Sequence, residues 1–375
     1  MKLLIALIVA FILFELQRYI YQKYWDKGLR ITISFSDAFV REGDRSTLLE
    51  IIENNKRMPL PILQVKFAIT RTFSFADDES SAVTDNYYRS DFFSMKSYCR
   101  ITRSYPFVCT KRGCYFMNDM DLIGRDFFIA TKCVKSIKHS SYICVLPKRI
   151  VADEIPECAI QLMGEIVRNS KLYEDPFEFR GLREYTNTDS MRKINWKASA
   201  RGEELMINQY NSTYSRDVVI ILNLKCAVVS AYEDIAEQSI RIADCIATKL
   251  LSEHVSVAFV TNGLDAITGE ACRVDSGSGN THIHSIEIVM SRIDINAEPV
   301  DLLQILERET VTCGKSCEYI IVSNYRRKEF LDEMDSYTAK GYNIRLVVPE
   351  YVRIPLGDRI KAQPNVIKWE LKEKA

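Results

Sequence analysis

Residues 217–261 read DVVIILNLKCAVVSAYEDIAEQSIRIADCIATKLLSEHVSVAFVT, and this stretch decides the fold class of the second half of the chain. It opens with 217–223, a continuous apolar run typical of strands buried on both faces of a sheet. Residues 255–261 are a second apolar run. Between them, residues 232–253 carry apolar side chains at helical spacing, namely Ile235, Ile240, Ile242, Ala243, Ile246, Leu250 and Leu251. A strand, a helix and a strand in this order predict a βαβ unit with parallel strands.

The same alternation continues towards the C-terminus. Helical periodicity is present at 285–293, 300–308 and 328–340, and short apolar strands are expected at 319–323 and 343–348. Strands that alternate with helices imply right-handed crossovers and a doubly wound parallel sheet. We therefore expect residues 216–375 to form one α/β domain.

Residues 29–150 have a different pattern. Short alternating or β-branched runs, such as 31–35, 46–52 and 63–70, are separated by turn residues. Strands at this spacing predict a β-sandwich. The Asp- and Ser-rich stretch 76–91 is expected to be a loop or hairpin tip, and residues 151–215 a linker segment. The predicted fold class is multidomain α+β: a transmembrane helix, a β-sandwich and a doubly wound α/β domain.

The N-terminus predicts the membrane anchor, over residues 1–28. Residues 3–14 are an unbroken apolar run of about 18 Å as a helix, shorter than the ~30 Å hydrocarbon core. A mostly apolar pattern continues to Tyr24, with a polar stripe of Glu15, Arg18 and Gln22, so we expect residues 3–24 to span the bilayer. An aromatic belt suited to the headgroup region is formed by Tyr19, Tyr21, Tyr24 and Trp25.

The alternative for this segment is a cleaved secretory signal, but no A-x-A cleavage motif follows the apolar run. Lys2 is the only basic residue before the span. Arg18, Lys23, Lys27 and Arg30 come towards or after its end. The positive-inside rule therefore predicts a single-pass protein of the cell membrane with the bulk of the chain in the cytoplasm.

Composition excludes some classes of function. Fifty Lys and Arg balance fifty Asp and Glu, so the chain lacks the basic excess of a general nucleic-acid binder. Its eleven cysteines include no C-x-x-C pair, and only four histidines are present. We expect reduced, mostly buried thiols rather than a zinc site or a disulfide framework.

Residues 177–201 read FEFRGLREYTNTDSMRKINWKASAR, a loop that leads into a short amphipathic segment. Ile194 and Ala198 are four residues apart and share a face, while Asp189 is a candidate cap for the following turn. Two interpretations stand side by side: a buried charge network that pins the loop, or a surface that docks a partner or a phosphate. The residues concerned are Arg180, Arg183, Glu184, Asp189, Arg192 and Arg201.

This stretch resembles the signature of the domain of unknown function 58 family, approximately R-E-Y-x-P-G-D-x-x-R-x-I-x-W-x-x-x-A-R. Residues 111–115, 121–128 and 145–147 resemble further family motifs, so the resemblance covers nearly the whole chain after the anchor. Asn187-Thr188 stands where many members have Pro-Gly, and many members have two membrane helices. The signature positions in step are Arg183, Glu184, Tyr185, Asp189, Arg192, Ile194, Trp196, Ala200 and Arg201.

The resemblance implies a bacterial or archaeal membrane-anchored protein whose C-terminal part is similar to a von Willebrand factor A domain. It also implies a MoxR-type AAA+ ATPase as partner, and a scaffold or adaptor role beside it. The signature residues expected to dock the partner or an anion are Arg183, Glu184, Tyr185, Asp189, Arg192, Trp196 and Arg201.

A von Willebrand A domain that binds Mg²⁺ carries D-x-S-x-S after its first strand. Here the matching positions 223–227 begin with Asn223 and have Lys225 in the middle, so the site is degenerate and we expect no metal. Residues 314–316 end like a P-loop, but Glu309 stands where that motif needs glycine. No motif for nucleophilic or metal-assisted catalysis is present.

These observations lead to one hypothesis and one alternative. The hypothesis is a non-enzymatic membrane-anchored scaffold without a cofactor, which acts with a MoxR-type AAA+ ATPase in the assembly or maturation of a protein complex. The alternative is a domain that senses an anion or phosphate, or hydrolyses a substrate, through the arginine-rich signature.

Overall fold

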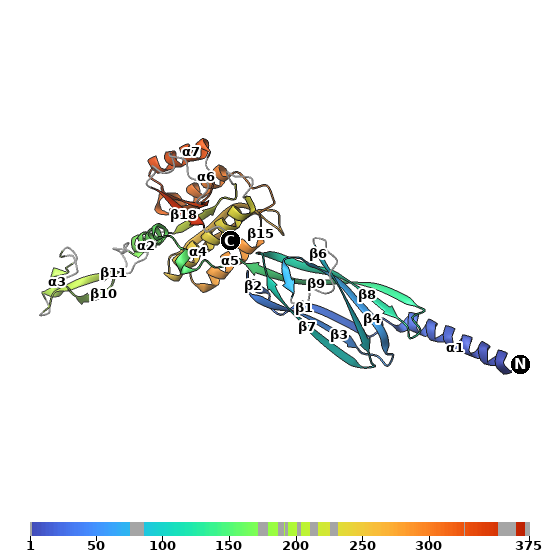
Figure 1. The fold of residues 1–375 in the computed structure, drawn as a ribbon. Helices are drawn as coiled ribbons and strands as arrows, with labels where there is room; N and C mark the ends of the chain where they lie inside the picture. Colours follow the sequence, from blue (N-terminus) through green and yellow to red (C-terminus); the bar gives the residue numbers. More distant parts are fainter. Residues whose placement is uncertain are drawn as a thin grey trace. The chain divides into compact units, whose positions relative to one another are not determined.

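The computed structural model divides the chain into two compact units, Met1–Lys148 and Arg149–Ala375 (Figure 1). Each unit is described by itself. The structure describes residues 2–75, 86–171, 179–186, 191, 194–200, 204–210, 217–225, 232–325, 327–351 and 365–371.

The first unit begins with helix α1 (Lys2–Tyr24), which is long and apolar enough to span a membrane, as predicted. The apolar side chains of its first half are exposed, whereas Tyr21 and Trp25 at its C-terminal end are buried in the core of the unit. Gly124 makes room for this junction, because a Cβ there would lie 2.4 Å from Cε3 of Trp25. The helix therefore joins the rest of the unit through buried contacts, and the predicted aromatic belt at the headgroups is wrong for Tyr21 and Trp25, because both side chains pack into the protein core.

Two sheets follow, and their inner faces share one hydrophobic core. Strand β3 shows why: its side chains alternate between buried and partly exposed along the whole strand, as a sheet with one covered face requires. All pairs are antiparallel except β2 with β9. The first sheet has the order β1 (Leu29–Phe35), β3 (Arg45–Asn54), β7 (Cys99–Cys109) and β5 (Phe73–Phe75). The second has the order β2 (Phe39–Arg41), β9 (Lys132–Leu146), β8 (Gly113–Arg125), β4 (Leu60–Thr70) and β6 (Asn86–Met95).

The stretch 76–91 differs from its expected loop. Residues 76–85 lie outside the described residues, but β6 begins at Asn86 and pairs with β4 as far as Thr70. Aromatic and polar residues alternate in β6, but the run of Asp and Ser before it gave the whole stretch the composition of a loop. The predicted loop was therefore too long at its C-terminal end.

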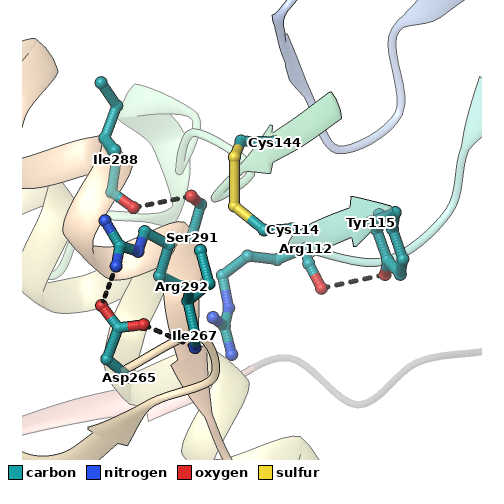
Figure 2. The surroundings of a disulfide bond; sticks show 9 residues. All are labelled: Arg112, Cys114, Tyr115, Cys144, Asp265, Ile267, Ile288, Ser291 and Arg292. Carbon is teal, nitrogen blue, oxygen red and sulfur yellow. Dashed lines mark hydrogen bonds and ion pairs between the residues drawn. A yellow bond between two sulfur atoms is a disulfide. The ribbon is translucent and has the colours of Figure 1, made fainter. Parts of the chain in front are cut away.

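The cysteines also differ from the expectation in one pair. Cys114 and Cys144 are register partners on β8 and β9, and a disulfide joins them (Figure 2). The prediction that all thiols are reduced is wrong for this pair in the structure, because the strand register brings the two side chains together across 30 residues. Burial raises the pKa of the free thiols of Cys109, to about 12, and of Cys272, to about 11. Buried thiols of this kind are poor nucleophiles.

The second unit is built on a mixed, mostly parallel sheet with the order β14-β13-β12-β16-β17-β18, and β15 pairs with β13. Strands β12 (Val218–Leu222) and β16 (Glu318–Val322) lie at its centre and are buried at every position. The other strands are β13 (Val257–Asp265), β14 (Ala271–Gly277), β15 (Ile293–Asp294), β17 (Asn343–Tyr351) and β18 (Val366–Leu371).

Helices cover both faces of this sheet. On one face, Ile220 and Leu222 pack against α2 (Glu157–Lys171), α4 (Tyr232–Ser252) and α5 (Asn280–Arg292). On the other, Val219 and Ile221 pack against α6 (Leu302–Cys313) and α7 (Lys328–Ala339). The described part of this unit also contains short 3₁₀ helices at Ala152–Glu154 and Gly314–Ser316. The predicted mixed α and β multidomain class is confirmed.

Helix α2 lies inside the stretch 151–215 that the sequence predicted as a linker. Its buried side chains Ala159, Leu162, Met163 and Ile166 belong to the core shared with α4. The start of that stretch is therefore part of the second unit. Later in the stretch come β10 (Phe179–Glu184), α3 (Trp196–Ser199) and β11 (Met206–Tyr210).

Candidate functional site

The signature stretch forms an antiparallel ribbon of two strands, β10 and β11. Arg183 faces Ile207 and Glu184 faces Met206 in the register, and an irregularity lies between Phe179 and Gly181. The pairing continues past β10, because the amide of Tyr185 donates to the carbonyl of Leu205 at 2.8 Å. The signature residues therefore lie on a paired backbone. We call residues 179–186, 191, 194–200 and 204–210 the signature ribbon.

The short helix α3 is fixed to this ribbon by Asn195. Its Oδ1 accepts from the amide of Ala198 at 3.0 Å, and its Nδ2 donates to Oδ1 of Asn208 on β11 at 2.7 Å. Ser199 adds a further link, since its hydroxyl accepts from the amide of Met206 at 2.8 Å. Asn195 is therefore the N-cap of α3. The predicted cap of Asp189 on the turn that follows it stays a prediction, because Asp189 lies outside the described residues.

The described residues of the ribbon include two buried isoleucines and several exposed side chains. Ile194 forms an isolated bridge with Ile207, and both are buried. Trp196, by contrast, is 68% exposed and Met191 is 73% exposed. Leu182 and Leu205 are exposed as well. The side chain of Ile194 is thus structural, whereas the indole of Trp196 is open to a partner.

The charged signature residues are only partly described. Arg183 and Glu184 are exposed, and Arg183 Nη1 donates to the carbonyl of Glu184 at 3.1 Å. Glu204, which sequence reasoning missed, shares a hydrogen bond with Glu184 that raises the pKa of Glu204. Tyr185 is partly exposed. The predicted network of arginines with Asp189 is not tested, because Asp189, Arg192 and Arg201 lie outside the described residues.

The second candidate position is the carboxyl edge of the parallel sheet, where ligands bind in doubly wound folds. Asn223 follows β12 and is buried beside Asn262 of β13 and Ser323 after β16. Nδ2 of Asn223 donates to Oγ of Ser323 at 2.8 Å, and its Oδ1 accepts from Nδ2 of Asn262 at 2.8 Å. We call these three residues the edge network.

The edge network uses its polar atoms on the protein itself. Asn262 Oδ1 accepts from the amide of Leu224 at 2.8 Å, and its Nδ2 also donates to the carbonyl of Val300 at 3.1 Å. Lys225 donates its amide to Oδ1 of Asn223 at 3.0 Å and places its ammonium 3.8 Å from Asp301. Neutral amides and a hydroxyl that bond one another hold three strand ends together. Within the part of the chain that the structure describes, no group of three or more His, Cys, Asp or Glu side chains is placed to hold a metal ion.

A buried charged cluster in the first unit was not found from the sequence. Glu50 on β3 is fully buried, and its Oε2 accepts from the hydroxyl of Tyr105 on β7 at 3.1 Å. Arg89 pairs with Asp91 at 3.2 Å and lies 3.8 Å from the ring centre of Tyr105. Burial, with Asp91 nearby, raises the pKa of Glu50 to about 7. A single Glu inside an alternating strand gives no sign of this, because only the strand register shows which face it occupies.

Comparisons with known proteins find likenesses to solved structures alone. No family profile matches it, and no curated protein matches it. Among solved structures it is similar to the CARDB domain of PF1109 from Pyrococcus furiosus, at 12% identity over 31% of this chain and 94% of that one, with a TM-score of 0.20. It is also similar to the cohesin CaCohA2 from Clostridium acetobutylicum, at 14% identity over 31% and 90%, with a TM-score of 0.23. The PapD-like domain 7 of human CEP192 gives 14% identity over 32% and 86%, with a TM-score of 0.20. Likenesses at these TM-scores carry no argument about function.

Proposed function

We propose that the protein is a non-enzymatic, membrane-anchored scaffold that docks a partner through the signature ribbon. The observation that carries this proposal is the exposure of Trp196 on an ordered ribbon, with Met191, Leu182 and Leu205 exposed on the same element. Tryptophan and arginine are enriched among the residues that contribute most to protein–protein binding. An exposed indole on the same ribbon as the exposed Arg183 and Glu184 is suited to an interface with a polar rim.

A degenerate von Willebrand A-like domain is the second part of the proposal. It is supported by the doubly wound sheet and by the position of Asn223 directly after the central strand β12. A von Willebrand A domain that binds Mg²⁺ has a carboxylate at that position, whereas here the amide of Asn223 bonds Ser323 and Asn262. The edge network then stabilises the domain, and the ribbon makes the contact with the partner.

The partner that we propose is a MoxR-type AAA+ ATPase, on the strength of the signature's resemblance to the domain of unknown function 58 family. Helix α1 supplies the anchor, and the basic residues after it favour a cytoplasmic location for both units. The cytoplasm keeps thiols reduced, so in that location Cys114 and Cys144 would be held as thiols in the cell and pair on oxidation.

The test is co-purification of the ATPase with tagged full-length variants. Trp196→Ala removes the exposed indole, and Arg192→Ala removes a charged side chain of the signature. Val311→Ala is the matched control, since Val311 is 81% exposed on α6 outside the signature. We expect the amount of ATPase that co-purifies with each of the first two variants to fall at least tenfold. The amount that co-purifies with the control should not change. Equal recovery with all three would contradict the docking role.

The alternative function, an anion sensor, is separated by a thermal-shift screen with phosphates, nucleotides and Mg²⁺. A ligand at a hundred times its Kd stabilises the folded protein by about 2.7 kcal/mol. Arg183 is exposed on the ribbon and accessible to such a ligand. A shift that Arg183→Ala abolishes would favour the sensor over the scaffold.

A further inference from the structure

The first unit has a hydrophobic end beside its helix, which the docking role does not use. The loop between β8 and β9 carries Phe127, Phe128 and Ile129 in succession, exposed by 73%, 62% and 56%. Consecutive exposed apolar residues are unfavourable in water unless something covers them. The ring of Phe128 lies 5.5 Å from that of Phe14 in α1. The loop therefore lies alongside the helix that is proposed to cross the membrane.

The position of Phe14 gives the depth of this loop. Phe14 ends the unbroken apolar run, and Arg18 lies one turn further on, about 6 Å along the helix axis at 1.5 Å per residue. A membrane surface at the level of Arg18 would thus place Phe128 roughly 6 Å inside it. Interfacial apolar segments insert by about 5–10 Å. With the membrane surface at the level of Arg18, which is nearer to the N-terminus than the predicted end of the span at Tyr24, the loop has the depth of an interfacial segment.

The loop is also ordered. Asp126 at its base is fully buried, and its Oδ1 accepts from the amide of Thr131 at 3.0 Å. Ile129 has a φ of 56°, which β-branched residues rarely adopt and which Gly or Asn would adopt more readily. An apolar side chain held in a strained conformation at an exposed tip indicates that the side chain itself has a use.

An apolar pocket of about 470 Å³ lies between this loop, the turn before β4 and α1. Its volume falls in the range of small-molecule sites, about 300–1,000 Å³. The polar atoms Oε1 of Gln17 and the hydroxyl of Tyr21 are shielded from solvent, so carbon atoms form almost all of its accessible wall. Leu16 of α1, Met58 before β4 and Phe128 of the loop are among its lining residues.

Basic side chains surround the same end of the unit. Arg125 and Lys132 are register partners at the base of the loop, and Lys132 is exposed. Arg57 is exposed next to Met58 of the pocket, and Arg18 is 43% exposed on α1. Near them, Asp126 is buried and Glu15 pairs with Arg18 at 3.5 Å. Excess positive charge at a membrane surface attracts anionic headgroups.

We propose that this end of the first unit inserts into the membrane interface and that the pocket holds one acyl chain of an anionic phospholipid, whose headgroup lies among the basic residues. We infer a lipid of the bilayer as the occupant because α1, the proposed membrane helix, forms one wall of the pocket. The proposal requires the membrane anchor of the proposed function but not the partner or the docking role of the signature ribbon.

Insertion is tested by fluorescence quenching in bilayers that contain brominated phospholipids. The full chain carries Phe128→Trp, and the control carries Phe116→Trp, since Phe116 is 49% exposed on β8 and packs on Tyr142 away from the pocket. The fluorescence of each introduced tryptophan is obtained by subtracting the emission of the unaltered chain. We expect brominated lipid to quench the tryptophan at position 128 at least threefold more than the one at position 116. Equal quenching would overturn the insertion.

Occupancy is tested by native mass spectrometry of the full chain released from nanodiscs of mixed anionic and zwitterionic phospholipid. The unaltered chain and Leu7→Trp, on an exposed part of α1 outside the pocket, should retain one anionic phospholipid. Leu16→Trp, which fills the pocket, should reduce retention at least tenfold. No retained lipid, or equal retention in both variants, would overturn the pocket assignment. Extraction of the protein from membranes by alkaline carbonate would instead refute the anchor itself.

Discussion

The buried carboxyl of Glu50 makes the stability of the first unit depend on pH. Glu50 is a buried residue of β3. The groups that face it are Tyr105 and Arg103 on β7 and Arg89 and Asp91 on β6. Tyr105 donates one hydrogen bond to it, while its Oε1 is buried without a partner among the described residues. Glu50→Gln keeps the shape and the bond to Tyr105 but removes the ionisable proton.

The size and sign of this pH dependence follow from the pKa of Glu50, which burial raises from an ordinary 4.5 to about 7. The folded state then binds this proton more tightly than the unfolded state, so its contribution is fully present below pH 4.5 and is lost as the pH rises to about 7. At about 1.4 kcal/mol per pH unit, the loss is roughly 3 kcal/mol. The Glu50→Gln variant should not suffer this loss, because its amide does not titrate.

The assay is amide hydrogen exchange of peptides from β3 and β7 in the full-length protein, corrected for the intrinsic rate at each pH. These strands report the opening of the unit without requiring the whole chain to unfold in one step. The variant should gain about 3 kcal/mol of opening free energy over the unaltered chain between pH 4.5 and pH 8. A difference that stays constant across this range would refute the reasoning.

Three further predictions follow from packing and hydrogen bonding. Asn262→Ala removes the acceptor of the buried Leu224 amide and one donor each from Oδ1 of Asn223 and the carbonyl of Val300, and should destabilise the second unit by about 2–3 kcal/mol, measured by exchange of β12 and β13 peptides; a loss below about 0.5 kcal/mol would show that the edge network is dispensable. Gly124→Ala places a Cβ 2.4 Å from the ring of Trp25 and should cost about 1–3 kcal/mol, seen as an earlier melting transition of the first unit, whereas Gly164→Ala, with nothing within 4 Å, should not; equal melting would contradict the close packing at the helix junction. In oxidised protein, peptide mapping without reductant should recover Cys114 and Cys144 linked, and full alkylation of both before reduction would rule the disulfide out.

The elements predicted best are those with a strong apolar period. Residues 232–253 were predicted as a helix, and α4 spans Tyr232–Ser252, because one face of this segment is continuously apolar. Strand β18 was not predicted, since only Trp369 and Leu371 in it are buried and the charged residues Lys368 and Glu370 interrupt its apolar pattern. Helix α2 had a readable signal in Leu162, Met163 and Ile166, which the proximity of the signature obscured.

The candidate site was predicted less completely, for a different reason. Asn223 could be located because it follows an apolar strand, but its partners Asn262 and Ser323 come from strands that meet it only in the folded sheet. The disulfide likewise depends on the register of two strands rather than on sequence spacing. Exposure of Trp196 could not be read from its neighbours, because Ile194, two residues earlier, is buried.

The most direct test of the central claim is a pull-down of the tagged full-length protein from its native host in mild detergent, with and without a chemical crosslinker. Bound proteins would be quantified by mass spectrometry against the bait. We predict near-stoichiometric recovery of a AAA+ ATPase, crosslinked to peptides of the signature ribbon around Trp196. If the bait is intact and abundant and no AAA+ ATPase is recovered even after crosslinking, the proposed scaffold function is contradicted.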